Sequence, residues 1–211
     1  MTASSDSIVQ GGAAPAAPPV SPLRPVPDNV TLYQTLHLVR KDLHNQNHGV
    51  LTRHRWFHVL RGCHRILEVG CGNGDLCRWL SGEYGKAMTG VDLVTGPYKR
   101  EGYEFQTCDI EQEDLPRGFE AAVSFDVLEH IQTDKVGRVL ANIGRSAPVL
   151  VFTIAGYGSP PEHLTVQSPG WWLDQLIQCT EPRNWSVETF NRYPQLLPQR
   201  TPVWLFMGTP L

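Results

Sequence analysis

The residues best suited to chemistry in this sequence lie in a glycine-rich stretch, ILEVGCGNGDLCRWL, at positions 66–80. Gly70, Gly72 and Gly74 occupy alternate positions between an apolar run and a helix-like run. Glycine adopts positive φ angles and lets the backbone approach a ligand closely, and a loop that leads into a helix offers unpaired N–H groups. The stretch therefore predicts a ligand-binding loop between a strand and a helix.

Acidic residues around this loop indicate which ligand it suits. The dinucleotide-binding fingerprint is G-x-G-x-x-G, whereas here the third glycine comes one residue early. Asp75 stands at the expected start of the helix, where a pyrophosphate would bind, and Glu68 stands at the expected end of the strand. Because like charges repel, these carboxylates disfavour a phosphate and favour a ligand that carries positive charge.

The segment from Glu68 to Gly74 resembles the E/D-x-G-x-G-x-G loop of class I S-adenosylmethionine-dependent methyltransferases, and the chain resembles the small-molecule, ubiquinone-type branch of that family. The resemblance covers roughly residues 50–155. It implies that S-adenosyl-L-methionine is the cofactor. Within the loop it assigns the cofactor contacts to Glu68, Gly70, Cys71, Gly72, Asn73 and Gly74.

Further cofactor contacts follow in the order that the family shows. A carboxylate in the position of Asp92 binds the ribose hydroxyls in the family, and it can accept two hydrogen bonds. Asp109 would accept the exocyclic amine of adenine, and Ile110 would pack against the base. The segment FDVLEHI, at 125–131, resembles the family segment after the fourth strand. The other contacts that the resemblance implies are Leu93, Phe125 and Asp126.

Two histidines are candidates for a catalytic general base. Transfer of a sulfonium methyl is an in-line displacement, and it needs a base only where the acceptor arrives protonated. His130 stands where the family often places substrate-side residues, and His163 follows the expected fifth strand. An imidazole titrates near neutral pH, so either can take a proton, although a lone histidine is more often structural. Glu129 is either a helix-start carboxylate or a cofactor contact.

Motifs of other methyl-transfer chemistries are not matched. The segment SPPE at 159–162 ends in an acid rather than an aromatic residue, so we interpret it as a rigid loop and not as an amino-methylating motif. Two histidine pairs with a spacing of four could bind a metal on a helix. No cysteine or carboxylate completes either set, and no metal is predicted. The pairs are His44/His48 and His54/His58.

Basic residues gather before the glycine loop, in a helical pattern at 31–62 that Gly49 is expected to divide into two helices. In the family, helices before the first strand cover the active site, so the resemblance implies a basic lid. Such a lid suits an anionic small molecule. The alternative is an ordinary solvated helix face. The basic residues are Arg40, Lys41, Arg53, Arg55, Arg61 and Arg65.

Strands and helices alternate along the rest of the chain. This alternation predicts an α/β, doubly wound Rossmann-like fold with a seven-stranded, mostly parallel sheet, an antiparallel last strand and helices on both faces. Ligands of such sheets bind beyond the carboxyl ends of the strands. The expected strands lie within 65–70, 86–93, 103–110, 118–131 (running into a helix), 148–155, 185–193 and 202–209, and the later helices within 75–85, 133–147 and 168–179.

The chain is expected to form one domain behind a Pro- and Ala-rich arm. Residues 1–30 offer too little apolar surface to offset the entropy of ordering, so we expect this arm to be disordered. The methyltransferase domain would span 31–211. It would comprise a helical lid at 31–62, a cofactor-binding half at 63–155, and a substrate-side segment with the last strands at 156–211.

Composition narrows the function further. The 211 residues carry a formal net charge of -3, which disfavours a nucleic-acid partner without excluding one. No apolar run reaches the roughly 20 residues of a membrane span, and the five cysteines are scattered, so we expect a cytoplasmic protein with free thiols. The expected activity is O-methylation of a small polar, sugar-like acceptor. The alternatives are a nucleotide or nucleic-acid methyltransferase and a non-catalytic binding protein. The sequence indicates no oligomeric state.

Overall fold

The computed structural model describes residues 48–93, 101–158, 161–191 and 201–211. The predicted arm and the start of the predicted lid lie outside these residues. The helices are α2 (His48–Trp56), α3 (Asp75–Tyr84), α4 (Val136–Ser146) and α5 (Pro169–Cys179), with the 3₁₀ helices η2 (Phe57–Leu60) and η3 (Leu128–His130). The strands are β1 (Arg65–Val69), β2 (Ala87–Asp92), β3 (Glu104–Thr107), β4 (Ala121–Phe125), β5 (Val149–Ala155), β6 (Arg183–Asn191) and β7 (Pro202–Pro210).

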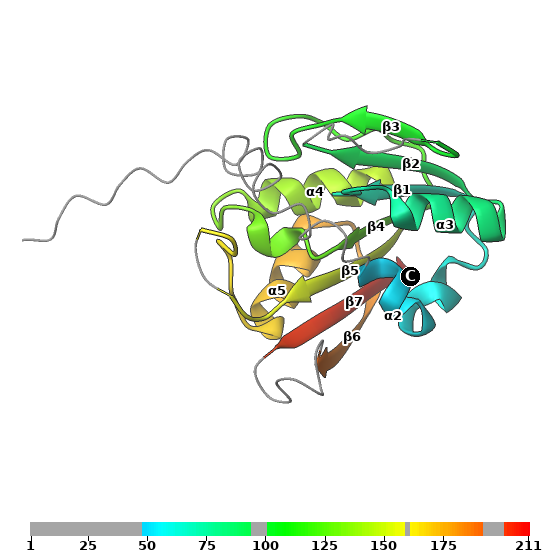
Figure 1. The fold of residues 1–211 in the computed structure, drawn as a ribbon. Helices are drawn as coiled ribbons and strands as arrows, with labels where there is room; N and C mark the ends of the chain where they lie inside the picture. The colour runs from blue at the N-terminus through cyan, green and yellow to red at the C-terminus, as the bar shows by residue number, and fades with distance from the viewer. Residues whose placement is uncertain (1–47, 94–100, 159–160, 192–200) are drawn as a thin grey trace, which may run out of the picture.

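One seven-stranded sheet forms the centre of the fold, in the order β3-β2-β1-β4-β5-β7-β6 (Figure 1). β1 pairs in parallel with β2 and β4, and the parallel pairing continues outward to β3 and β5. β7 runs antiparallel to both of its neighbours, β5 and β6. The predicted fold, a mostly parallel sheet whose last strand is antiparallel, is therefore confirmed.

Helices cover both faces of the sheet because its central strands are apolar on both sides (Figure 1). Successive side chains of a strand point to opposite faces. Leu67 and Val69 of β1 accordingly join the core that also contains residues of α4 and α5. Ile66 joins the core that contains residues of α2 and α3. Glu68 alternates with Leu67 and Val69, and so it lies on the α3 side of the sheet.

The predicted start of α5 is present in the structure. The Ser168 hydroxyl accepts a hydrogen bond from the backbone N–H of Trp171 at 3.2 Å, and Pro169 occupies the first turn. Trp172 is fully buried, and Trp171 packs, partly buried, against the same core. Both indoles therefore contribute to packing.

Two local features differ from the prediction. Gly49, expected to separate two helices, lies in the first turn of α2. The helix expected after β4 is only the three-residue η3. The backbone carbonyl of Glu129 accepts hydrogen bonds from the N–H groups of Leu164 and Thr165, each at 2.9 Å. In a continuing α-helix this carbonyl would accept the N–H four residues later. Because Leu164 and Thr165 occupy it instead, the helix ends.

All five cysteines are free thiols. Among the residues that the model describes, no helix has the length and apolarity needed to cross a membrane.

Candidate functional site

The first half of the glycine loop is hydrogen-bonded to the end of β2. The N–H groups of Gly70 and Cys71 both donate to the carbonyl of Val91, at 2.8 and 3.0 Å. The N–H of Gly72 donates to Asp92 Oδ2 at 2.8 Å. The loop and Asp92 therefore lie together at the carboxyl edge of the sheet, where ligands of this fold class bind.

The second half of the loop is held by the first turn of α3. The Asn73 amide donates to Asp75 Oδ2 at 2.8 Å, and the N–H of Asp75 donates back to Asn73 Oδ1 at 3.1 Å. The guanidinium of Arg78 pairs with the Asp75 carboxylate. Residues three apart on a helix are neighbours, so Arg78 can reach Asp75. Its positive charge offsets the negative charge of Asp75, which we expected to repel phosphate groups. Asp75 alone does not set the charge of the ligand.

Tyr103 is a site residue that the sequence interpretation missed. A side chain at Gly74 would collide with its ring and hydroxyl, and a Cβ at Gly90 would lie 3.1 Å from its ring and still closer to the Cys71 sulfur. Gly74 is therefore needed for packing against Tyr103 as well as for the turn. A tyrosine just before a short strand looks like an ordinary strand residue, and no sequence signal marked it.

Glu68 is buried beneath the loop. It is 6 % exposed, and its Oε2 accepts a hydrogen bond from the Cys77 thiol of α3 at 2.9 Å. Burial is the main cause that raises the pKa of Glu68 from 4.5 to about 8. The Cys77 hydrogen bond lowers this pKa, and the carboxylates of Asp92 and Asp75 add to the rise. Glu68 is thus largely neutral at pH 7 without ligand, which corrects our expectation of a standing negative charge.

A pH-dependent stability follows from the buried Glu68 carboxyl. Because its pKa is raised on folding, its contribution to stability is complete below about pH 4.5 and is lost as the pH rises towards about 8. We expect the free energy of unfolding to fall over this window, and Glu68→Gln to flatten that fall. Chemical denaturation at pH 5, 6.5 and 8 measures the effect, with the exposed Glu83→Gln as the matched control. If the free energy of unfolding changed with pH equally in the two variants, Glu68 would not be the source of the pH dependence.

The predicted adenine site lies beside the end of β2. The N–H of the residue before Asp109 donates to the carbonyl of Asp92 at 2.9 Å. Asp109 Oδ1 accepts the backbone N–H two residues further on at 3.0 Å, and Oδ2 accepts the side-chain amide of Gln112 at 2.7 Å. Each carboxylate oxygen has a second lone pair for a ligand. Ile110 is buried, and Leu93, which follows β2, is half-buried.

The turn after β4 lies directly against the glycine loop. A side chain at Gly70 would collide with Val127. Asp126, at φ 57°, donates its N–H to the carbonyl of Thr153 at 3.0 Å and accepts that residue's hydroxyl at 3.2 Å. The ring of Phe125 packs against the tryptophan of α2, with 4.9 Å between ring centroids. Phe125 and Asp126 therefore hold the turn in place.

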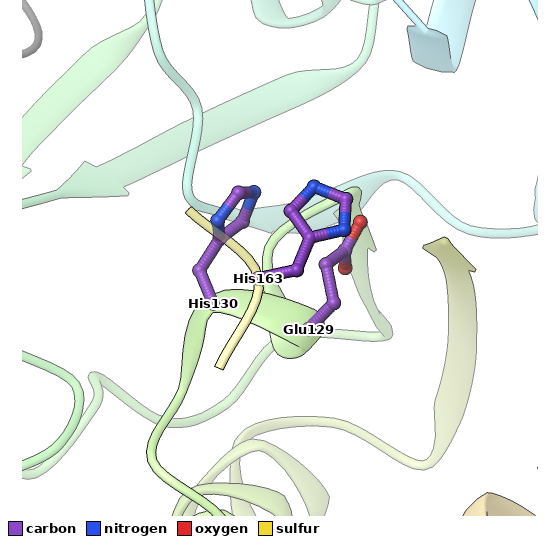
Figure 2. A group of neighbouring side chains, drawn as sticks. All are labelled: Glu129, His130 and His163. Atoms are coloured by element: carbon purple, nitrogen blue, oxygen red, sulfur yellow. The ribbon is translucent and has the colours of Figure 1, made fainter. Parts of the chain in front are cut away.

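The two alternative base residues, His130 and His163, lie side by side (Figure 2). Their rings meet edge to face, with centroids 4.7 Å apart and an interplanar angle of 83°. Glu129 lies next to them and is fully buried, and its Oε1 accepts a hydrogen bond from the N–H of Ala155 at 3.1 Å. We call Glu129, His130 and His163 the Glu-His-His cluster. Sequence reasoning treated the histidines as alternatives, whereas the fold brings them to one place.

Both histidines of the cluster are fixed through the same ring nitrogen. His130 Nδ1 lies 2.5 Å from the carbonyl oxygen of Glu162, and His163 Nδ1 contacts the carbonyl oxygen of Tyr157. A carbonyl oxygen only accepts, so each Nδ1 carries the hydrogen, and the lone pair of each neutral ring lies on Nε2. Each Nε2 can therefore take a proton or bind a cation.

Gly158 allows the His163 ring to lie where it does. Its φ is +104°, and a Cβ there would stand 2.7 Å from Cγ of that ring. We expect Gly158→Ala to displace the ring and to lower the turnover of methyl transfer roughly tenfold to a hundredfold, while S-adenosylhomocysteine binds as before. Steady-state rates and calorimetry measure the two effects. The control is Gly62→Ala, which has no atom near its Cβ position. Equal rates in both variants would contradict this role.

Two basic residues of the predicted lid have other partners in the part of the chain that the structure describes. Arg40 and Lys41 lie outside that part. Arg55 forms an ion pair with Glu188 of β6, so an acidic residue from a distant strand neutralises its charge. Arg65 begins β1 and therefore lies at the amino edge of the sheet, opposite the glycine loop, where its guanidinium stacks over a phenylalanine at 5.6 Å. Sequence proximity could not reveal either placement.

A family model described as a methyltransferase domain matches residues 40–206. The chain belongs to this methyltransferase domain family, which confirms the assignment to the class I S-adenosylmethionine-dependent methyltransferases and to their cofactor.

Individual relatives agree with this family. Over 119 residues the chain is 24 % identical to the cyclopropane-fatty-acyl-phospholipid synthase of Escherichia coli K12, covering 54 % of this chain and 30 % of the relative. The chain thus spans about a third of the length of the curated relatives it matches.

Two solved structures share the fold. One is the 1,6-didemethyltoxoflavin-N1-methyltransferase of Burkholderia thailandensis, with a TM-score of 0.68, 18 % identity, and coverage of 92 % of this chain and 95 % of that one. The other is the phosphoethanolamine N-methyltransferase 2 of Haemonchus contortus, with a TM-score of 0.60, 18 % identity, and coverage of 79 % and 53 %.

Proposed function

We propose that this protein transfers the methyl group of S-adenosylmethionine to an oxygen atom of a small polar acceptor. The observation that carries the proposal is the Glu-His-His cluster, whose first two residues follow closely on the turn that contacts the glycine loop. A hydroxyl is a poor nucleophile while it keeps its proton, so an oxygen acceptor needs a group that removes or loosens this proton. Two imidazoles with fixed tautomers supply such a group.

In this proposal the cofactor lies over the carboxyl ends of β1 and β2. The loop from Gly70 to Gly74 approaches its amino-acid part, and Asp92 accepts hydrogen bonds from the ribose hydroxyls. Asp109 accepts the adenine amine and Ile110 packs on the base. Glu68 lies below the loop and ionises when a cationic ligand offsets the cost of its burial.

The acceptors of the structural relatives support a small substrate. The Burkholderia enzyme is solved with bound 1,6-didemethyltoxoflavin, and the Haemonchus enzyme is named for phosphoethanolamine. Those names describe nitrogen acceptors. Our preference for oxygen therefore rests on the cluster of this chain and not on the relatives.

The proposal is tested in two steps with the full chain. Calorimetry with S-adenosylhomocysteine first establishes cofactor binding. Methyl-labelled S-adenosylmethionine is then offered with two acceptor panels, one of sugars and other alcohols or phenols, and one of matched amines. We expect label to pass to the hydroxyl panel. Transfer to amines alone would replace oxygen by nitrogen as the acceptor atom, and absence of S-adenosylhomocysteine binding would refute the enzymatic function.

A further inference from the structure

The Glu-His-His cluster has the donor set of a metal site, and we propose that it binds one divalent transition-metal ion, which in turn binds the acceptor oxygen. The inference deepens the proposed function and rests on it. The sequence does not indicate this site, because the histidine pairs with metal-ligand spacing are His44/His48 and His54/His58.

The geometry of the cluster brings three ligand atoms together. One ligand atom each from Glu129, His130 and His163 lies within 4.8 Å of the other two (Figure 2). Ligands at about 2.0 to 2.2 Å from a zinc-sized ion lie roughly 3.4 Å apart in a tetrahedral site. Binding therefore requires the side chains to close by roughly an ångström. Two donors come from η3 and the third from the loop after β5, so the ion would tie these segments together.

The surroundings of the histidines match those of metal ligands. A metal-bound imidazole usually donates its other ring N–H to a backbone carbonyl or a carboxylate, which fixes the tautomer and the ring direction. Both rings have such a contact through Nδ1, to the carbonyl oxygens of Glu162 and Tyr157. Two independent backbone contacts thus orient the two rings, and the ion would bind one nitrogen of each.

The third ligand is a fully buried carboxyl group. Glu129 has no exposed surface, and the N–H of Ala155 orients its Oε1 at 3.1 Å. A buried carboxylate is expensive unless a positive charge or a metal compensates it. A divalent ion held between this carboxylate and two imidazoles would be such a positive charge. Such a set of two nitrogens and one oxygen suits Zn²⁺, Fe²⁺, Co²⁺ or Mn²⁺ and leaves coordination positions open.

The ion would change how the acceptor loses its proton. An acceptor hydroxyl bound to the ion becomes more acidic, and its proton passes to water. The oxygen then attacks the methyl carbon, so that a C–O bond forms and the C–S bond breaks. The electron pair of the broken bond stays on sulfur and gives S-adenosylhomocysteine and the methyl ether. In this scheme the histidines would hold the ion, the ion would make the hydroxyl more acidic, and water would accept the proton.

The test uses Co²⁺ alone as the probe. The full chain is treated with EDTA, dialysed, and titrated with Co²⁺ in a calorimeter and in a visible absorption spectrometer, where the cobalt spectrum reports imidazole coordination. We expect one ion per chain. We also expect His130→Ala and His163→Ala each to weaken binding at least tenfold. His58→Ala, which removes an exposed histidine of the other described pair, is the matched control and should bind Co²⁺ normally.

Separate outcomes decide the metal site and the proposed function. S-adenosylhomocysteine affinity, measured on the same samples, shows whether each variant is folded. Suppose that all proteins bind S-adenosylhomocysteine, but that Co²⁺ binds to none of them or binds equally to the wild type and every variant. The proposed metal site is then refuted, while the proposed methyl transfer is not. If the wild-type chain binds Co²⁺ in the cluster but not S-adenosylhomocysteine, the proposed function fails and the metal site stands without the catalytic role.

Discussion

Replacing Asp92 by alanine is expected to weaken the binding of S-adenosylmethionine and S-adenosylhomocysteine by roughly a hundredfold or more. The carboxylate accepts the N–H of Gly72 at 2.8 Å and, in our proposal, also accepts the ribose hydroxyls. Hydrogen bonds to a charged group contribute about 1.5 to 3 kcal/mol each, and about 1.4 kcal/mol is a factor of ten in affinity. Calorimetric titration measures the loss directly.

Two companion variants separate ligand binding from loop structure. Asp92→Asn keeps an oxygen for the Gly72 N–H but loses the charge, so we expect an intermediate loss of affinity. Asp114→Ala changes an exposed acid whose ion pair with Arg145 is long, at 3.6 Å, and it should leave affinity unchanged. Unchanged affinity in Asp92→Ala would show that the ligand does not use this edge of the sheet as we propose.

The second large effect is expected at the histidines of the Glu-His-His cluster. His130→Ala and His163→Ala should each lower the turnover of methyl transfer roughly a hundredfold to ten-thousandfold. The affinity for S-adenosylhomocysteine should stay within about threefold, because neither residue is proposed to hold the cofactor. Steady-state rates with the hydroxyl acceptor and calorimetry measure the two quantities.

The double variant shows whether the two histidines act together. Groups that act as one unit are strongly non-additive. We therefore expect the variant with both histidines replaced to be about as slow as the slower single variant, and His58→Ala to be as fast as wild type. Full activity in both single variants would show that the cluster takes no part in methyl transfer. Additive losses would show two separate roles.

The fold was predictable because its signals are local. The apolar run that ends at Val69, the glycines after it and the cap at Ser168 each determine the conformation of neighbouring residues. The alternation of strands and helices then leaves few topologies. The segment after β4 departs from its local pattern, because backbone hydrogen bonds from Leu164 and Thr165 to Glu129 end the helix.

The candidate site was only partly predictable because its properties depend on distant residues. Burial under α3 sets the pKa of Glu68, and Tyr103 contacts the glycine loop from a position just before β3. Arg55 forms an ion pair with Glu188 on β6, and this pairing could not be predicted from the run of basic residues in the sequence. His130 and His163 are far apart in the chain, and only the tertiary fold makes them neighbours.

A crystal structure with S-adenosylhomocysteine bound tests the central claim most directly. We predict that the ribose contacts Asp92 and that the sulfur faces the Glu-His-His cluster, with room between them for one methyl group and an acceptor atom in contact at about 3 to 3.5 Å. A ligand bound away from the glycine loop, or one whose sulfur faces away from His130 and His163, would contradict the claim.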